Sequence, residues 1–294
     1  MKKKVLIGMM GVVLLASGCN RLDAFTGKIP FFKDDNNGQN IQEQKSGQAI
    51  NVQEETKNED KNLDDSSTST NDQMEDEENL LTLDNMFFNQ IVEINGHKII
   101  QNPENTLALV NKQFGLPSTY LPNDLMRPKV NFSFGSQKLE KSYLRQEAAS
   151  ALEKMFLDAK KANVELFAVS GYRSYAYQDQ LFKAEVKKVG EEKALEAVAF
   201  PGQSEHQTGL SMDISSRGEG LLLTENFGTT KEGIWLAENA HRFGFVLRYP
   251  KGKEAVTGYQ YEPWHFRYVG VQAATVIYEN NWTLEEYFNI VKKV

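Results

Sequence analysis

Two short segments of this chain contain residue types that could carry out hydrolysis. The first, SEHQTGLSMD at 204–213, contains His206 and Asp213, and the second, EPWH at 262–265, contains Glu262 and His265. Two imidazoles and a carboxylate are ligands that Zn²⁺ accepts, and three protein ligands leave a fourth tetrahedral position open for water. A structural zinc site would instead be closed by four protein ligands. The residues therefore predict one catalytic Zn²⁺ per chain, held by His206, Asp213 and His265.

A strand is expected at 210–215 to position the first carboxylate. Apolar residues at 210, 212 and 214 alternate with polar residues at 211, 213 and 215, after a glycine at 209. This is the period of a strand with one apolar and one polar face. Asp213 is therefore expected on the polar face.

The second segment lies in an aromatic run, YQYEPWHFRYV at 259–269, which also predicts a strand. Strict alternation would put Glu262 and His265 on opposite faces of it. Pro263 lies between them, and proline within a sheet is confined to edges and bulges. We therefore expect a bend at Pro263 that brings both side chains to one site.

These motifs resemble those of a known family. The pattern SxHxxGxxxD followed by ExWH is similar to that of the VanY-type zinc D-alanyl-D-alanine carboxypeptidases and the related L,D-carboxypeptidases. Their larger group includes lysostaphin-like peptidases and the hedgehog signalling domain. The resemblance covers roughly residues 105–275, including LVNK at 109–112, YLPNDL at 120–125 and SGYRS at 170–174. It implies an α+β, hedgehog/D-Ala-D-Ala-peptidase-like domain, with helices packed on a small, mainly antiparallel sheet that carries the zinc site.

The resemblance also implies a role for each motif residue. The zinc ligands would be His206, Asp213 and His265. Glu262 would be the catalytic base, and the residues that contact substrate would be Arg173, Gln178 and Ser204.

The chemistry of these roles can be stated in physical terms. Zn²⁺ lowers the pKa of a bound water to about 7, and a nearby carboxylate such as Glu262 can take its proton and deliver it to the leaving amine. Arg173 has two open roles. It could stabilise the oxyanion that develops during the reaction, or it could bind the terminal carboxylate of a peptide bidentately, which would make the enzyme an exopeptidase.

The family implies that the substrate is the peptidoglycan stem peptide, trimmed from its D-amino-acid end. Cleavage between two D-alanines and removal of a single D-alanine after an L-centre both remain open. A different class also remains open, because hedgehog-like domains retain zinc ligands without peptidase turnover. Such a protein would be a non-catalytic zinc-binding module of the cell wall.

The N-terminus indicates where the protein acts. Three lysines precede an apolar run from 5 to 16 that is too short to span a bilayer, so residues 1–18 are expected to be a signal peptide. The run ends in LLASGC, which is similar to a bacterial lipobox and makes Cys19 the expected lipidation site, with palmitate as part of the lipid. Cys19 is the only cysteine, so no internal disulfide is expected. We expect a lipoprotein anchored to the outer face of a bacterial cell membrane.

Residues 19–85 are expected to be a disordered acidic tether. The stretch is rich in Asn, Gln, Asp, Glu, Ser and Thr and shows no sustained apolar periodicity. Residues 51–80 contain eleven acids and two lysines, a net charge of −9 against −7 for the whole chain. The acidic balance therefore belongs to the tether, and nothing in the composition indicates a nucleic-acid partner.

The composition from 86 to 294 is that of one globular domain, which we expect to be a monomer. Asn95-Gly96 predicts a hairpin at 91–100, and Thr283 and Glu286 have the spacing of a capping box. Helices are expected at 142–162, 175–188, 191–198, 232–243 and 284–293. Further strands are expected at 164–170 and 245–249. Helices first and strands gathered later favour an α+β domain over a doubly wound sheet.

Overall fold

The computed structural model describes residues 81–294. The expected signal peptide, Cys19 and nearly all of the expected tether lie outside these residues. The first element described is β1 (Thr82–Leu83), which pairs in parallel with β11 (Lys292–Lys293) near the other end of the chain. The folded part therefore includes residues slightly before the boundary expected at 86. No helix within 81–294 is long and apolar enough to cross a bilayer.

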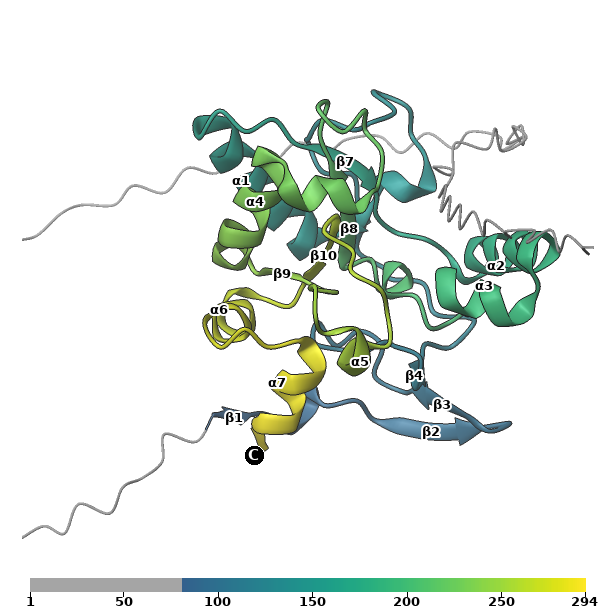
Figure 1. Cartoon of the computed structure of the whole chain (residues 1–294). Helices are drawn as coiled ribbons and strands as arrows, with labels where there is room; N and C mark the ends of the chain where they lie inside the picture. The colour runs from purple at the N-terminus through teal and green to yellow at the C-terminus, as the bar shows by residue number, and fades with distance from the viewer. Residues whose placement is uncertain (1–80) are drawn as a thin grey trace, which may run out of the picture. The chain divides into compact units, whose positions relative to one another are not determined.

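The centre of the described part is a four-stranded sheet in the order β7-β8-β10-β9 (Figure 1). Its strands are β7 (Phe167–Ser170), β8 (Ser211–Ser215), β10 (His265–Tyr268) and β9 (Phe245–Leu247). All three neighbouring pairs are antiparallel. The register of β8 against β10 places His265 directly opposite Asp213. The expected small antiparallel sheet is therefore confirmed.

Helices cover this sheet and share its core. Helix α1 (Gln146–Lys161) and helix α4 (Lys231–Asn239), which continues as a 3₁₀ turn over Ala240–Phe243, contribute to one apolar cluster with the strands. Leu152 and Met155 of α1 belong to it together with Met212 and Phe266 of the sheet, and all four side chains are fully buried. The helix expected at 142–162 is thus present and packs its apolar face against the sheet.

A second cluster forms around the C-terminal helices α6 (Val271–Glu279) and α7 (Leu284–Ile290). Helix α7 begins with the predicted capping box, in which Thr283 Oγ1 accepts from Glu286 N and Glu286 Oε2 accepts from Thr283 N. Helix α6 was not anticipated. Its segment VQAATVIYE is rich in β-branched and apolar residues and has no polar N-cap side chain, so it lacks the usual start signal of a helix.

The remaining elements lie around this centre. They are β2 (Ile91–Ile94), β3 (His97–Ile100), β4 (Phe114–Gly115), β5 (Leu125–Met126), β6 (Leu144–Arg145), α2 (Tyr175–Val189), α3 (Glu191–Ala197) and α5 (Glu254–Thr257). The predicted hairpin is present, because β2 pairs with β3 and both turn residues have positive φ, 52° at Asn95 and 80° at Gly96. Helices α2 and α3 lie side by side (Figure 1).

One strand prediction was wrong. The run at 259–269 is a strand only from His265 onward, and Glu262 lies in the turn that precedes it. The backbone N–H of His265 donates to the carbonyl oxygen of Glu262 at 3.1 Å, and the N–H of Glu262 donates to that of Tyr249 at 3.0 Å. Pro263 has no N–H for a ladder, so the chain turns where a strand was expected to bend.

The polar face of β8 does not face solvent. All five residues of β8 are buried, because the strand lies between β7 and β10 and its polar side is covered by other polar groups. Asp213 therefore lies on the expected face but in an interior environment.

The packing of α1 leads to a stability prediction with an internal control. Leu152 is completely buried, whereas Leu157 on the same helix is 57% exposed. Leu152→Ala should lower the free energy of unfolding by about 2–5 kcal/mol, since it leaves a cavity in the core. Leu157→Ala makes the same chemical change and should stay within about 0.5 kcal/mol of the parent. Urea unfolding of both variants measures the difference, and equal losses would contradict the assignment of the packed face.

Candidate metal centre

Three side chains from separate elements converge at the middle of β8. His206 comes from the 3₁₀ helix η3 (Glu205–Thr208), Asp213 from β8 and His265 from the first position of β10. His206 Nε2 lies 3.4 Å from Asp213 Oδ2, and His265 Nδ1 lies 3.1 Å from Asp213 Oδ1. All three residues are buried, and one ligand atom from each lies within 4.8 Å of the others. The structure therefore brings together the three predicted metal ligands.

Local backbone features bring these groups to one place. Antiparallel pairing sets His265 opposite Asp213, as described above. Helix η3 ends at Gly209, which has φ 67°, and this left-handed conformation redirects the chain into β8. A side chain there would also press on Leu125 Cδ2 at 3.0 Å and Arg145 Cγ at 3.1 Å. Glycine at 209 is thus needed to connect His206 to the strand that carries Asp213.

The hydrogen bonds at the far ends of the two imidazoles leave the correct atoms free for a metal. His206 Nδ1 lies 2.7 Å from the carbonyl oxygen of Gly171, so that nitrogen carries the proton and Nε2 has the lone pair. His265 Nε2 lies 3.3 Å from Glu205 Oε2, which leaves Nδ1 free in the same way. Metal-binding histidines are usually oriented by such contacts to a carbonyl or a carboxylate.

The carboxylate supplies the clearest test of whether a metal fits. Asp213 Oδ1 is buried and has no hydrogen-bond partner among residues 81–294. Burial by itself would raise the pKa of Asp213, but His206 and His265 outweigh it and hold that pKa well below its usual range, so the group is an anion. A buried anionic oxygen without a donor is costly unless a cation contacts it. Two nitrogens and one such oxygen fit Zn²⁺.

The carboxylates around His265 also favour a positive charge at its ring. Burial lowers the pKa of an imidazole, but the negative carboxylates of Asp213, 3.1 Å away, and Glu205 outweigh it and raise the pKa of His265 to about 9. Burial lowers the pKa of His206, whose imidazole is therefore neutral at pH 7. Neutral imidazole is the form that binds metals, so a metal at His265 would take the place of the proton on Nδ1.

Glu262 lies at the rim of the cluster. Its Oε2 is 3.7 Å from His265 Nδ1, and its side chain is 26% exposed, in contrast to the three buried residues. Burial raises the pKa of Glu262 to about 7. A carboxylate with a pKa near neutrality can both accept and return a proton under physiological conditions. The turn at 262–265 thus brings Glu262 and His265 to one site, as was expected of a bend at Pro263.

The three residues expected to contact substrate lie beside this cluster. Arg173 Nη1 donates to Gln178 Oε1 at 2.8 Å, and its backbone N–H donates to the carbonyl oxygen of His206 at 3.1 Å. Gln178 is in the first turn of α2, which is capped by Ser174, and its Nε2 donates to the carbonyl oxygen of Ala199 at 2.7 Å. Ser204 is buried and directly precedes η3. Arg173 and Gln178 are therefore in direct contact.

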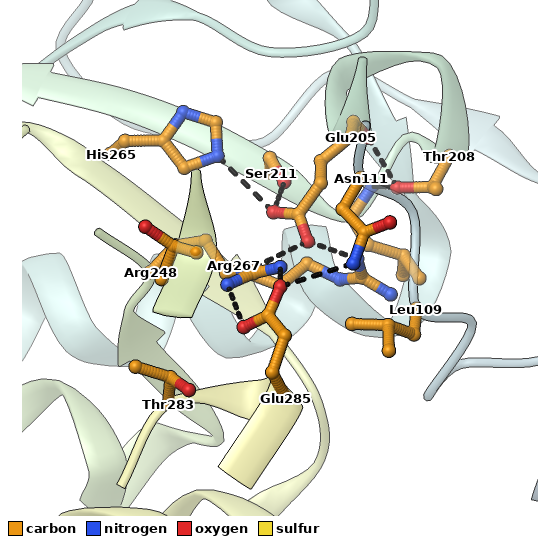
Figure 2. A network of polar contacts seen from close by, with 12 residues as sticks. Leu109, Asn111, Glu205, Thr208, Ser211, Arg248, His265, Arg267, Thr283 and Glu285 are labelled. Carbon is orange, nitrogen blue, oxygen red and sulfur yellow. Dashed lines mark hydrogen bonds and ion pairs between the residues drawn. The ribbon is translucent and has the colours of Figure 1, made fainter. Parts of the chain in front are cut away.

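Two charged residues near the site were not anticipated. Lys141 is partly buried, and burial lowers the pKa of its ammonium group, against the attraction of Asp213. Glu205 is 1% exposed and contacts His265 together with two buried arginines, Arg248 and Arg267 (Figure 2). Burial by itself would raise the pKa of Glu205, but the two guanidinium groups hold it well below its usual range. In the sequence, the one indication that Glu205 belongs to the site is its position directly before His206.

Comparisons with known proteins agree with this geometry. Residues 141–271 match the profile of the family described as VanY, D-alanyl-D-alanine carboxypeptidase. The protein YodJ of Bacillus subtilis (strain 168), for which a carboxypeptidase activity is proposed, is 58% identical over 213 residues. That match covers 72% of this chain and 78% of YodJ.

Two solved structures are similar to this one. The LdcB LD-carboxypeptidase has 57% sequence identity and a TM-score of 0.72, and the match covers 73% of this chain and 100% of that one. A mutant of the vancomycin resistance D,D-pentapeptidase VanY from a VanB-type resistance cassette, in complex with Zn(II), has 35% identity and a TM-score of 0.52. That match covers 63% of this chain and 99% of the other. The chain therefore belongs to the VanY family of D-alanyl-D-alanine carboxypeptidases.

Proposed function

We propose that this protein is a zinc-dependent carboxypeptidase that removes the C-terminal D-alanine from peptidoglycan stem peptides. The observation that carries the proposal is the convergence of two imidazole nitrogens and an unpartnered carboxylate oxygen, with Glu262 Oε2 3.7 Å from one of those nitrogens. The substrate class is supported by the family description and by the names of the similar structures.

His206, Asp213 and His265 would hold the Zn²⁺. When bound, the metal acidifies water and polarises a carbonyl group. Glu262 takes a proton at Oε2 and later gives it to the leaving amine, a role that suits its position at the rim and its raised pKa. The three protein ligands would stay fixed in η3, β8 and β10, so among these four residues Glu262 is the one that changes its protonation during the reaction.

Arg173 binds the terminal carboxylate of the substrate. Its Nη1 is held by Gln178 and its Nη2 lies 3.4 Å from Ser170 Oγ, so the planar guanidinium has a defined orientation. Asp213 and Glu262 lie within electrostatic reach of it, which places its charge at the cluster. A fixed guanidinium beside the reacting groups selects peptides that end there, as an exopeptidase requires.

Two cleavages are compatible with this site, and a different observation favours each. The family description favours cleavage between two D-alanines of a pentapeptide stem. The likeness to the LdcB LD-carboxypeptidase, at 57% identity over the whole of that chain, favours removal of one D-alanine from a tetrapeptide stem. In both reactions the leaving group is D-alanine.

The place of action is proposed from the N-terminal sequence. The run that ends in LLASGC supports a lipid anchor on Cys19, outside the cytoplasmic membrane, and the acidic segment that follows supports a tether from the membrane to the wall. A flexible chain of that length has a root-mean-square span of roughly 45 Å.

The substrate proposal predicts release of free D-alanine. The full chain loaded with Zn²⁺ should release it from a synthetic pentapeptide stem, a tetrapeptide stem or both, and quantifying D-alanine distinguishes the two specificities. The same peptides with an amidated C-terminus should resist cleavage, because Arg173 then has no carboxylate to bind. Release from neither free peptide would refute the proposal, and equal cleavage of the amidated peptides would refute the role of Arg173.

The role of Glu262 predicts a separation of metal binding from turnover. Glu262→Gln keeps the size of the side chain but cannot accept the proton, so kcat should fall by about 10²–10⁴. The variant should retain about one zinc per chain by elemental analysis, because Glu262 is not a metal ligand in this arrangement. His206→Ala, the comparison variant, should lose both zinc and activity. Full activity of Glu262→Gln would show that another group is the base.

The anchor predicts a lipid on one residue. Cells supplied with a labelled palmitate analogue should incorporate label into the parent protein and not into Cys19→Ser, since this is the only cysteine of the chain. Unchanged labelling of the variant, or an unlabelled parent, would rule out lipidation at this position.

A further inference from the structure

Glu205 is the most completely enclosed acid near the metal centre. It immediately precedes His206 in η3, and its side chain is entirely buried. Figure 2 shows it between His265 on one side and Arg248 and Arg267 on the other. It is not among the residues assigned above to metal binding, proton transfer or substrate contact.

The two oxygens of Glu205 have separate partners. Oε1 accepts from Arg248 Nε at 2.7 Å and from Arg267 Nη1 at 2.8 Å. Oε2 accepts from Ser211 Oγ at 3.2 Å and lies 3.3 Å from His265 Nε2. Because the arginines occupy one oxygen, the other is left to face the imidazole as an acceptor.

We propose that Glu205 is the positioning residue of His265, which accepts the Nε2–H hydrogen bond and thereby leaves the Nδ1 lone pair directed at the metal. This inference rests on the proposed zinc site. Glu205 touches neither substrate nor metal in this arrangement, so its effect on the reaction passes through His265.

The other histidine of the cluster, His206, is oriented by a different kind of hydrogen-bond acceptor. His206 Nδ1 lies against the carbonyl oxygen of Gly171, a neutral acceptor that depends only on the backbone. Gly171 must remain glycine for this approach, because a Cβ there would lie 2.5 Å from the carbonyl oxygen of Tyr143. His265 instead has a charged acceptor, which makes the imidazole a stronger metal ligand. A side-chain substitution at 205 can therefore remove the acceptor of His265, whereas the acceptor of His206 is a backbone group that such a substitution leaves in place.

The arginines fix the carboxylate in place. Arg267 also donates through Nη2 to the carbonyl oxygens of Thr106 at 3.0 Å and Ala108 at 2.8 Å. Arg248 donates through Nη1 and Nη2 to both carboxylate oxygens of Glu285, at 2.8 and 2.6 Å. The side chains of Glu205, Arg248 and Arg267 are fully buried and that of Glu285 is 12% exposed, so Glu205 cannot rotate without breaking charged hydrogen bonds.

Glutamine at 205 would reverse the preference for the tautomer. If its oxygen faces the arginines, its amide donates toward His265 Nε2, which moves the ring proton to Nδ1 and blocks metal binding there. If its oxygen faces His265, its amide meets two guanidinium donors. Neither arrangement reproduces the contacts of the carboxylate.

Glu285→Gln is the matched control, because it removes the same charge from the same network without contact with His265. We expect Glu205→Gln in the full chain to bind Zn²⁺ about 10–100-fold more weakly in competition with a chromophoric chelator. Glu285→Gln should keep the parent affinity, although both variants should melt at lower temperature. Parent affinity in Glu205→Gln, or an equal loss in both variants, would overturn the proposal.

A measurement on the unaltered protein decides the matter even if Glu205→Gln fails to fold. Nitrogen-15 NMR of the histidine rings in the Zn²⁺-loaded protein should show His265 protonated at Nε2 with the metal at Nδ1. Metal at Nε2 of His265 would overturn the proposal. If the affinities follow expectation but no stem peptide is cleaved, the positioning role stands and the proposed function fails.

Discussion

The antiparallel pairing of β8 with β10 is the constraint on which the site depends. It places Asp213 and His265, which are far apart in sequence, opposite each other with their polar atoms in the interior. Buried ionisable groups are costly unless they are paired, so this register is tolerable only because every charge at the site has a partner or a place for one. His206 supplies one partner, Glu205 supplies another, and the unpartnered Asp213 Oδ1 leaves the place for a cation.

The network behind His265 serves geometry more than stability. Glu205, Arg248, Arg267 and Glu285 carry two negative and two positive charges, so the group is neutral as a whole. Replacing such a buried network by apolar residues is often neutral for stability, whereas removing one member typically costs about 3–5 kcal/mol. Through Arg248, which directly follows β9, and Arg267 of β10, the network also contacts helix α7 and the segment before β4. A metal ligand is thereby held by contacts that reach across the fold.

Features that depend only on residues close together in the sequence were predicted correctly. The Asn95-Gly96 hairpin and the capping box at Thr283 depend on neighbouring residues, and both are present. The three clustered ligands were identified from residue type and motif. The strand expected over 259–264 is not formed, because Pro263 cannot donate to a ladder and the chain turns at 262–265 before β10 begins. Glu205 was missed because its partners, Arg248 and Arg267, lie in segments whose proximity only the tertiary structure reveals.

The metal ligands of the site lie on rigid parts of the fold, whereas Glu262 and Arg173 lie in connecting segments. His206, Asp213 and His265 are held by the sheet, by the carbonyl oxygen of Gly171 and by Glu205, so their positions follow from the core. Glu262 lies in a turn, and Arg173 lies in the connection between β7 and α2. Connections between rigid elements tolerate change better than the elements themselves. Changes in these connections could therefore alter which peptide end is bound while the metal centre stays intact, which accounts physically for a D,D-pentapeptidase and an LD-carboxypeptidase that both resemble this one fold.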